Sequence, residues 1–206
     1  MERKTTKHDL RSAATRERLI AVARTLFAQR GYADVGTEEI VQTAGVTRGA
    51  LYHQFRDKAE LFTAVVEAVE TRIVAEVTAA LAEPTTDPVE RLISGARAFL
   101  AACADPATER IVLRDAPAVL GAARWQELSE RYGLGLVQQA VHTLLADGTF
   151  APQPAAPLAR LLLGALNEAA RYVSAAEDPR AATEECLRII GGMLDGLRTA
   201  PGADRR

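Results

Sequence analysis

The chain has 206 residues, of which 48% are hydrophobic and 25% are charged, and its formal net charge is −2 at pH 7. A chain of this length and apolar content can bury a substantial core. It shows no stretch of about 20 apolar residues and no signal-peptide pattern, so we expect a soluble, cytoplasmic protein. Cys103 and Cys186 have neither metal-binding nor redox spacing and are expected to be reduced thiols.

The charges are distributed unevenly. Residues 1–60 carry 11 Lys and Arg against 8 Asp and Glu, whereas residues 61–206 carry 14 against 19, and all three lysines lie in the first 60 residues. A mildly basic end suits contact with phosphates, although ordinary scatter of charges would also give a net +3. We expect residues 1–14 to be a flexible polar arm. A plain tail is the favoured interpretation, and an arm that follows the minor groove or a phosphate of DNA is the alternative.

Helical periodicity begins after this arm. Residues 15–30 place apolar side chains on one helical face, and Gly31 is expected to end that helix. Alanine and leucine dominate the chain, and no run alternates with period two for long. We therefore predict an all-α fold.

The next segment has the pattern of a helix-turn-helix. Thr37 is the expected N-cap of a first helix, and Gly45 is expected to end it in the left-handed conformation that glycine adopts easily. Thr47 is expected to cap a second short helix over residues 48–55. Such a pair of helices presents the second one to the major groove of DNA.

A dense, ungapped set of positions in residues 15–62 matches a known family pattern. These positions are Ile20, Ala23, Leu26, Phe27, Gly31, Thr37, Ile40, Ala44, Gly45, Val46, Thr47, Gly49, Leu51, Tyr52, Phe55, Lys58 and Leu61. The segment, about a quarter of the chain, resembles the DNA-binding head of the TetR family of bacterial transcriptional regulators. That pattern usually has two hydroxyl residues at the start of the first helix of the helix-turn-helix, and here Gly36 replaces the first of them, which removes one candidate phosphate contact.

The motif and the resemblance assign roles on a DNA-binding face. The predicted DNA-binding residues are Thr37, Thr47, Arg48, Gly49, Tyr52, His53 and Lys58. Thr47, Arg48 and His53 are expected near base edges, with Arg48 the best candidate for guanine. Thr37, Tyr52 and Lys58 are expected to hold phosphates, and the small Gly49 lets backbone approach a partner closely. Packing within the head is the alternative for Tyr52, and plain solvation is the alternative for Lys58.

Further helices are predicted along the rest of the chain. They cover residues 58–82, opened by a capping box of Asp57 and Glu60; 88–104, capped by Asp87; 106 to about 115; 122–146; 155–176; and 180–199. We expect an N-terminal three-helix head joined by the long helix 58–82 to a helical body. The predicted domain limits are 1–14 for the arm, 15–60 for the head, 61–200 for the body and 201–206 for a flexible tail.

The last two predicted helices have a wider apolar surface than packing against the rest of a single chain requires. In proteins that resemble this family, these helices pair with their copies in a four-helix bundle. The candidate dimer residues are Leu158, Leu162, Ala165, Leu166, Ala169, Tyr172, Ile190, Met193, Leu194 and Leu197. The alternative is a thickly buried helix pair in a monomer. A dimer is favoured because one short recognition helix buries too little surface for tight specific binding.

The middle helices are expected to enclose an effector cavity. Candidate lining residues are Phe99, Cys103, Arg114, Trp125, Tyr132, His142 and Asn167. Trp125 is the only tryptophan and is more often a core anchor than a ligand platform. Asn167 interrupts an apolar helix, so its amide needs a neighbour or a ligand as partner.

The sequence therefore predicts a ligand-responsive, homodimeric repressor that a small molecule releases from a palindromic operator. It contains none of the common nucleophile, phosphate-loop, dinucleotide or zinc-protease motifs, so we expect no enzyme, no cofactor and no metal. Two alternatives stay open. One is a dimeric DNA-binding protein without an effector, and the other is a helical interaction protein that does not bind DNA.

Overall fold

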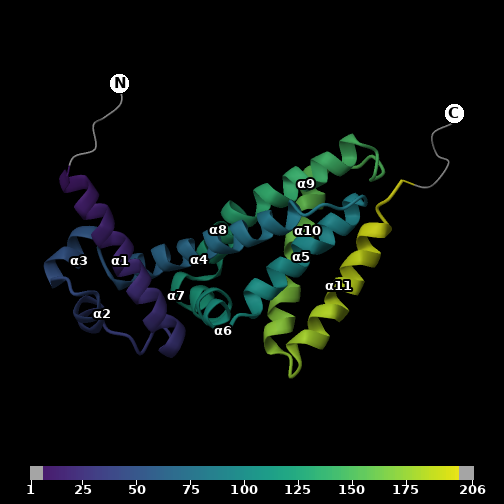
Figure 1. Ribbon diagram of the computed structural model, residues 1–206. Coiled ribbons are helices and arrows are strands. Elements are labelled where there is room, and N and C mark those ends of the chain that lie inside the picture. The colour runs from purple at the N-terminus through teal and green to yellow at the C-terminus, as the bar shows by residue number, and fades with distance from the viewer. Residues whose placement is uncertain (1–6, 200–206) are drawn as a thin grey trace. The chain divides into compact units, whose positions relative to one another are not determined.

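The computed structural model describes residues 7–199, with side chains from residue 10 onward (Figure 1). Within that range the regular structure is helical, apart from one isolated bridge between Phe150 and Arg198. The chain groups into two compact units. One runs to Val69 and includes Pro106–Trp125, and the other holds Glu70–Asp105 and the residues from Gln126 onward.

The boundaries of these two units differ from the predicted domain limits of 15–60 and 61–200. We keep the predicted limits as a proposal about function. We call the first unit the head unit and the second the body unit. The expected tail at 201–206 and the first residues of the expected arm lie outside the described residues.

The first helix, α1 (Lys7–Arg30), begins well before residue 15, so the prediction of a flexible arm is wrong for residues 7–14. Two features explain the extension. Ala13 and Ala14 have high helix propensity, and the Ser12 hydroxyl accepts a 2.7 Å hydrogen bond from the Gln54 side chain. The helix ends at Gly31, which has a φ of +85° and donates its N–H to the Phe27 carbonyl at 2.8 Å.

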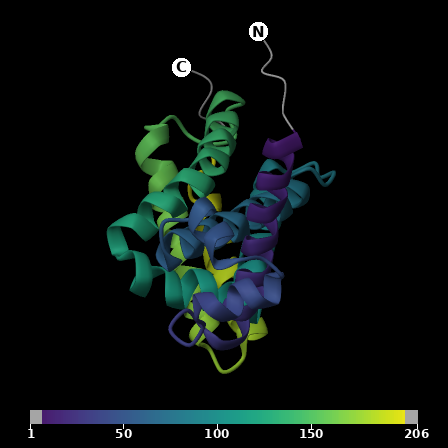
Figure 2. The ribbon, with the colours of Figure 1, turned by 90° about the vertical axis from the view of Figure 1, so that its left-hand side faces the viewer.

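The helix-turn-helix consists of α2 (Thr37–Ala44) and α3 (Arg48–Gln54). Both lie against α1, as Figures 1 and 2 show. Gly45 has a φ of +64°, as predicted for the residue that ends α2. The prediction that Thr37 caps α2 is wrong. Gly36 occupies the N-cap in an extended conformation, one residue earlier, and no side chain caps the helix.

The long helix α4 (Lys58–Leu81) opens as the sequence predicts. Asp57 Oδ1 accepts a hydrogen bond from the Glu60 N–H at 2.8 Å, and Glu60 Oε2 accepts one from the Arg56 N–H at 2.7 Å. These bonds satisfy amides that the first helical turn leaves without partners.

An aromatic cluster forms the centre of the head unit. Phe27, Phe55 and Phe62 are fully buried, and the rings of Phe27 and Phe62 meet edge to face with centroids 5.3 Å apart. Tyr32 completes the cluster, with its ring 4.9 Å from Phe62. Each such pair contributes about 0.5–1.5 kcal/mol beyond the burial of its apolar area.

The segment 106–120 is one continuous helical path. It comprises α6 (Pro106–Thr108), the π-helical segment η1 (Glu109–Asp115) and α7 (Ala116–Leu120). The prediction of a helix end near residue 115 is wrong, because Pro117 stands in the first turn of α7, where a missing N–H is tolerated. Gly121, with a φ of +81°, ends the path instead.

The body unit begins with α5 (Pro88–Ala104), which Asp87 caps as predicted by accepting from the Val89 N–H at 2.8 Å. The predicted helix 122–146 is interrupted by a π-helical segment. It appears as α8 (Ala122–Ser129), η2 (Glu130–Leu134) and α9 (Gly135–Ala146). Glycine is a weak helix former, and Gly133 leaves room for Leu163, whose Cδ1 would lie 3.0 Å from an added Cβ.

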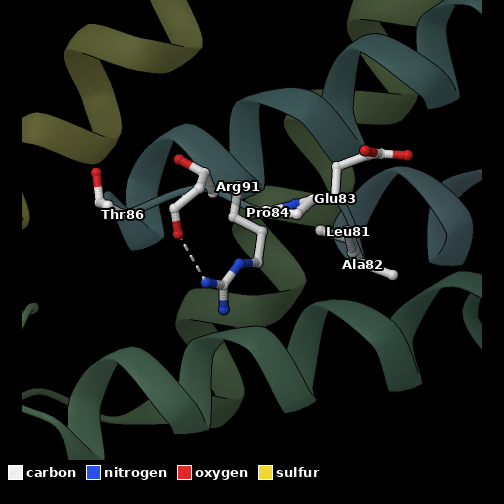
Figure 3. Close-up of a pocket in the computed structure, with 7 residues that line it drawn as sticks. Leu81, Ala82, Glu83, Pro84, Thr86 and Arg91 are labelled. Carbon is white, nitrogen blue, oxygen red and sulfur yellow. Dashed lines mark hydrogen bonds between the residues drawn. The ribbon is translucent and has the colours of Figure 1, made fainter.

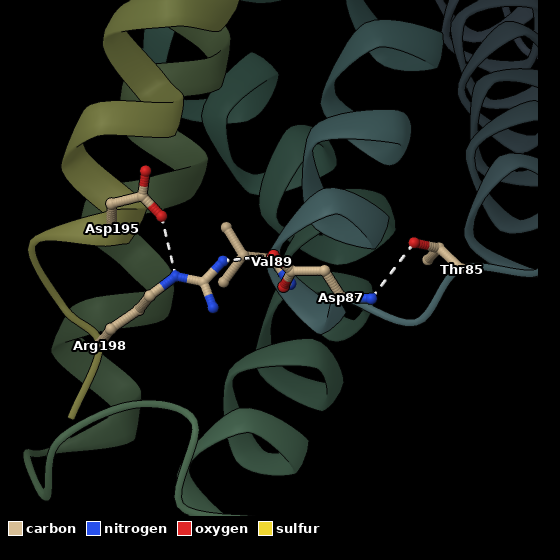
Figure 4. Close-up of polar contacts among 5 residues, drawn as sticks. All are labelled: Thr85, Asp87, Val89, Asp195 and Arg198. Carbon is tan, nitrogen blue, oxygen red and sulfur yellow. Dashed lines mark hydrogen bonds and ion pairs between the residues drawn. The ribbon is translucent and has the colours of Figure 1, made fainter. Parts of the chain in front are cut away.

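The last helices are α10 (Ala155–Ala175) and α11 (Pro179–Asp195), both packed on α5. The helix α11 stops before the predicted residue 199, because the chain turns at Gly196 and Leu197 and residues 197–199 then bond to residues 149–151. Arg198 fixes this segment by donating to Asp87 at 2.6 Å and to Asp195 at 2.8 Å (Figure 4). The hydrogen bond from Arg198 lowers the pKa of the Asp87 carboxyl.

Candidate DNA-binding surface

The helix α3 buries one face and presents the other to solvent. Leu51 and Phe55 lie in the core, whereas Thr47, Arg48 and His53 are exposed. Thr47 Oγ1 accepts a hydrogen bond from the Ala50 N–H at 3.2 Å, so the predicted cap of this helix is confirmed. A short helix with a polar outer face has the dimensions that the major groove admits.

Arg48 lies at the start of this outer face and already has two neighbours. Its Nη1 is 2.9 Å from Glu38 Oε1 on α2, and its guanidinium carbon lies 5.6 Å from the centroid of the Tyr52 ring. The side chains of Arg48 and Glu38 are 64% and 76% exposed, and a pair this exposed contributes about 1 kcal/mol or less. Arg48 can therefore exchange Glu38 for another acceptor at low cost.

Lys58 is held in place by an aromatic ring. Its Nζ lies 4.0 Å from the centroid of the Tyr32 ring, which is within cation–π range. Partial burial lowers the pKa of Lys58, while the negative charge of Asp34 acts in the opposite direction. The ammonium is therefore oriented at the N-terminus of α4, and Lys58 is not simply solvated.

The other residues predicted to contact phosphates or to allow close backbone approach are Tyr52, Thr37 and Gly49. Tyr52 is 43% exposed, so its hydroxyl is accessible, and its ring packs with Arg48 as well. Thr37 is half-buried in the first turn of α2. Gly49 is exposed, and an added Cβ would meet only Thr47 Oγ1 at 3.9 Å, so the fold itself does not require glycine there.

Two residues of this surface were missed by sequence reasoning. Glu38 is ten positions from Arg48 in a different helix, and the pair forms only when α2 and α3 pack together. Tyr32 is likewise distant from Lys58 in the sequence. The only signal in the sequence for the Glu38 contact was the pair of acidic residues in α2. The only signal for the Tyr32 contact was the presence of an aromatic residue directly after Gly31.

Comparisons with known proteins agree with this geometry. Residues 19–65 match the family model described as bacterial regulatory proteins, tetR family, and residues 89–197 match a tetracyclin repressor-like C-terminal domain. The second match alone covers more than half of the chain. The chain belongs to the TetR family of bacterial transcriptional regulators.

Several relatives share either the head or the whole fold. A TetR-family regulator from Pectobacterium atrosepticum is 34% identical, covers 95% of this chain and 99% of its own, and superposes with a TM-score of 0.81. The crystal structure of RolR in complex with resorcinol, at 21% identity, has the same fold, with a TM-score of 0.69 and coverage of 93% and 96%. The regulator AcrR of Shigella flexneri is 44% identical over 59 residues, which are 29% of this chain but only 27% of AcrR.

The predicted effector residues of this TetR-family chain are divided between its two units. Arg114 and Trp125 belong to the head unit, and the other five belong to the body unit. The prediction that Arg114 and His142 line an interior cavity is wrong, because both are exposed. Arg114 pairs with Glu109 at 3.1 Å. The Asn167 amide is satisfied by donating to Ser129 Oγ at 3.0 Å.

A buried carboxyl in the body unit was also missed. Glu70 on α4 is only 8% exposed, and burial raises its pKa to about 7. Cys103 on α5 is buried too, and burial together with the charge of Glu70 raises its pKa to about 12. Glu70 follows Val65, Val66 and Val69 in an apolar helix, and this pattern gave no sign that the acid would be buried.

A groove in the body unit has none of the predicted effector residues in its lining, which Figure 3 shows. It has a volume of about 660 Å³ and is lined by residues 81–86 and Arg91, where α4 turns toward α5. Arg91 Nη2 donates to the Thr85 carbonyl at 3.3 Å. The groove is open, and its only charged groups are those of Glu83 and Arg91.

The predicted dimer residues differ in accessibility. Leu158, Ala169, Ile190 and Leu194 are buried within the single chain and belong to its core. Tyr172 and Met193 are exposed, and the remaining four are half-buried. Leu161 and Ile189, which are not among the candidate dimer residues above, are 72% and 62% exposed. The accessible apolar face of α10 and α11 is therefore Leu161, Tyr172, Ile189 and Met193.

Among the described residues, no helix combines the length and the apolar character needed to cross a membrane. No group of three or more His, Cys, Asp or Glu side chains among them is arranged to hold a metal ion.

Proposed function

We propose that this TetR-family chain is a homodimeric repressor that binds a palindromic operator and is released by a small molecule. The observation that carries the proposal is the outer face of α3, where the exposed Arg48 lies in the capped first turn and its guanidinium packs with the Tyr52 ring. Arginine donates two hydrogen bonds to guanine O6 and N7, so this face can read bases in the major groove.

Lys58 supports the same interpretation from the end of α4. Its ammonium is oriented by the Tyr32 ring, and an oriented cation at a helix N-terminus suits a phosphate oxygen. Together with the Tyr52 hydroxyl it would set the register of α3, while Arg48, Thr47 and His53 would select the sequence. A repressor of this kind would act in the cytoplasm, where the DNA of a bacterium lies.

The homodimer is supported by the apolar face of α10 and α11. Leu161, Tyr172, Ile189 and Met193 are each at least half exposed, and an added Cβ at Gly164 or Gly192 would meet nothing within 4 Å. Large apolar side chains beside open glycines fit close packing against a second copy. Dimerisation would then place two α3 helices about 34–36 Å apart, on successive major grooves.

We further propose that the effector is a small molecule. The crystal structure of RolR holds resorcinol, and we extend a small-molecule effector to this chain by analogy. Phe99, Cys103, Tyr132 and Asn167 remain the candidates for its site. A ligand must bind two conformations unequally to release DNA, and we propose α4 as the helix that transmits the change.

The test combines two experiments on the full chain. Selection from random double-stranded DNA should enrich a palindrome, and a screen of aromatic and amphipathic small molecules should yield ligands that weaken its binding and change Trp125 fluorescence. Enrichment without any such ligand would favour a DNA-binding protein with no effector. Failure to enrich any duplex would favour the interaction protein and refute the proposed function.

A further inference from the structure

Asp115 connects a distant segment of the chain to the turn after α1. Its Oδ2 accepts a 2.7 Å hydrogen bond from the Tyr32 N–H, 83 positions away in the sequence. Gly31 lies directly beside this contact, since an added Cβ there would be 3.4 Å from the same oxygen. A charged acceptor makes this a strong hydrogen bond, and it fixes the backbone of Tyr32.

The Tyr32 side chain carries this constraint to the DNA-binding surface. Its ring packs against Phe27 and Phe62, with centroids 5.7 Å and 4.9 Å away, and the Lys58 ammonium lies over its face. The backbone of Tyr32, its ring and the position of Lys58 therefore depend on one another. Asp115 does not touch the surface itself, but it holds the residue on which Lys58 rests.

The position of Asp115 depends in turn on the π-helical segment that it ends. In η1 the Ala116 N–H bonds to the Ile111 carbonyl, five residues back. The Val112 carbonyl would accept from residue 117 in the same pattern, but Pro117 has no N–H. The Trp125 indole N–H donates to that carbonyl instead, at 2.9 Å. Trp125 thus supports the wide turn at the point where proline removes a donor.

We propose that Asp115 is a positioning residue for DNA binding, which acts through Tyr32 on Lys58, and that Trp125 keeps it in place by supporting the π-helical turn. This inference rests on the proposed function, because its consequence for DNA binding is the loss of the phosphate contact of Lys58. A π-helical turn becomes α-helical when its hydrogen bonds shift from five residues back to four. This shift of one residue rotates the side chains that follow by about 100° around the helix axis. Asp115 would then leave the Tyr32 amide.

The first test does not use DNA. The chain has only three lysines, so labelling lysine Cε with ¹³C gives three methylene signals in an NMR spectrum. The ring of Tyr32 should shift the Lys58 signal upfield. Lys58→Arg assigns the signal. Asp115→Ala and Trp125→Phe should move it toward the other two, whereas Glu109→Gln, a carboxyl-to-amide change in the same π-helical segment, should leave it in place. A Lys58 signal unchanged in Asp115→Ala overturns the inference, whatever the protein binds.

The second test is a double-mutant cycle on the selected duplex. Asp115→Ala should weaken binding about as much as Lys58→Ala and reduce the log–log salt slope by about 0.9, the loss of one phosphate contact. In the Lys58→Ala background it should change affinity less than twofold, because the two residues act through one contact. Equal losses in both backgrounds would show that Asp115 acts independently of Lys58 and overturn the inference. Absence of any duplex binding by the wild-type chain would instead refute the proposed function, and the lysine signals would still report the link.

Discussion

The carboxylate of Glu38 accepts a 2.9 Å hydrogen bond from the guanidinium of Arg48, so the residue that we propose reads guanine has an acidic partner in the free protein. Under that proposal, binding to DNA would break this pair and bring Glu38 close to phosphates. Both effects oppose association.

Glu38→Gln should therefore strengthen binding to the operator and to unrelated duplexes. The exposed pair contributes about 0.2–1 kcal/mol, which corresponds to roughly a 1.4- to 5-fold gain in affinity. Glu39→Gln is the matched control, because it removes the same charge from the neighbouring residue, which pairs with Arg30. If the two variants gain equally, the effect is one of net charge, and the Glu38–Arg48 pair has no role of its own.

Lys58→Ala should weaken binding to every sequence alike and flatten the salt dependence. Loss of one phosphate contact reduces the log–log slope by about 0.9. Lys58→Arg should keep the slope, since it keeps a cation over the Tyr32 ring. Equilibrium titrations over a range of salt concentrations measure both, and an unchanged slope in Lys58→Ala would remove Lys58 from the phosphate contacts.

Ile189→Glu and Leu161→Glu should convert the dimer into folded monomers. Both side chains are exposed on the single chain, so a charge there costs the monomer little, but it would be buried and unpaired in the interface. Gln139→Glu, an exposed position on α9, is the control. Sedimentation and circular dichroism give the assembly state and the fold, and dimers in both variants would refute this interface. Leu194→Glu is a poor probe, because Leu194 is 2% exposed and the variant should unfold.

Glu70 predicts a pH dependence of stability. Its pKa in the folded chain is about 7, above its ordinary value of 4.5, so the folded state holds a proton that the unfolded state has lost. The free energy of unfolding should therefore fall as pH rises from about 4.5 to about 7 and then level off, by about 3 kcal/mol in total.

Glu70→Gln removes this titration, and chemical denaturation at pH 5 and pH 8.5 tests the prediction. The variant should match the wild type at pH 5 and exceed its stability at pH 8.5. Glu76→Gln, exposed on the same helix, should follow the wild type at both values. A wild-type chain whose stability does not fall across this range would contradict a buried, neutral Glu70.

Local signals in the sequence predicted much of the head. Gly45 and Thr47 act through their own backbone and side chain, so the turn and the start of α3 could be read residue by residue. The same holds for Asp57 and Asp87, which cap α4 and α5. The family and the helical fold followed from these elements.

The predictions that failed concern features that depend on tertiary contacts. The π-helical segment before Ala116 and the pairing of Leu197–Thr199 are set by Pro117, Trp125 and residues 149–151, which lie elsewhere in the chain. Periodicity identified apolar residues of α10 and α11 but could not tell the core residue Leu194 from the exposed Ile189, because both lie on apolar stretches.

The central claim is that α3 reads bases through Arg48. The most direct measurement is the affinity of the wild-type chain and Arg48→Ala for the selected palindrome and for its symmetric single-base variants. The account predicts that the wild type discriminates against replacement of one guanine in each half-site by about 1–3 kcal/mol, and that Arg48→Ala loses this discrimination at that position alone. A variant that keeps the wild-type preference at every position would contradict the claim.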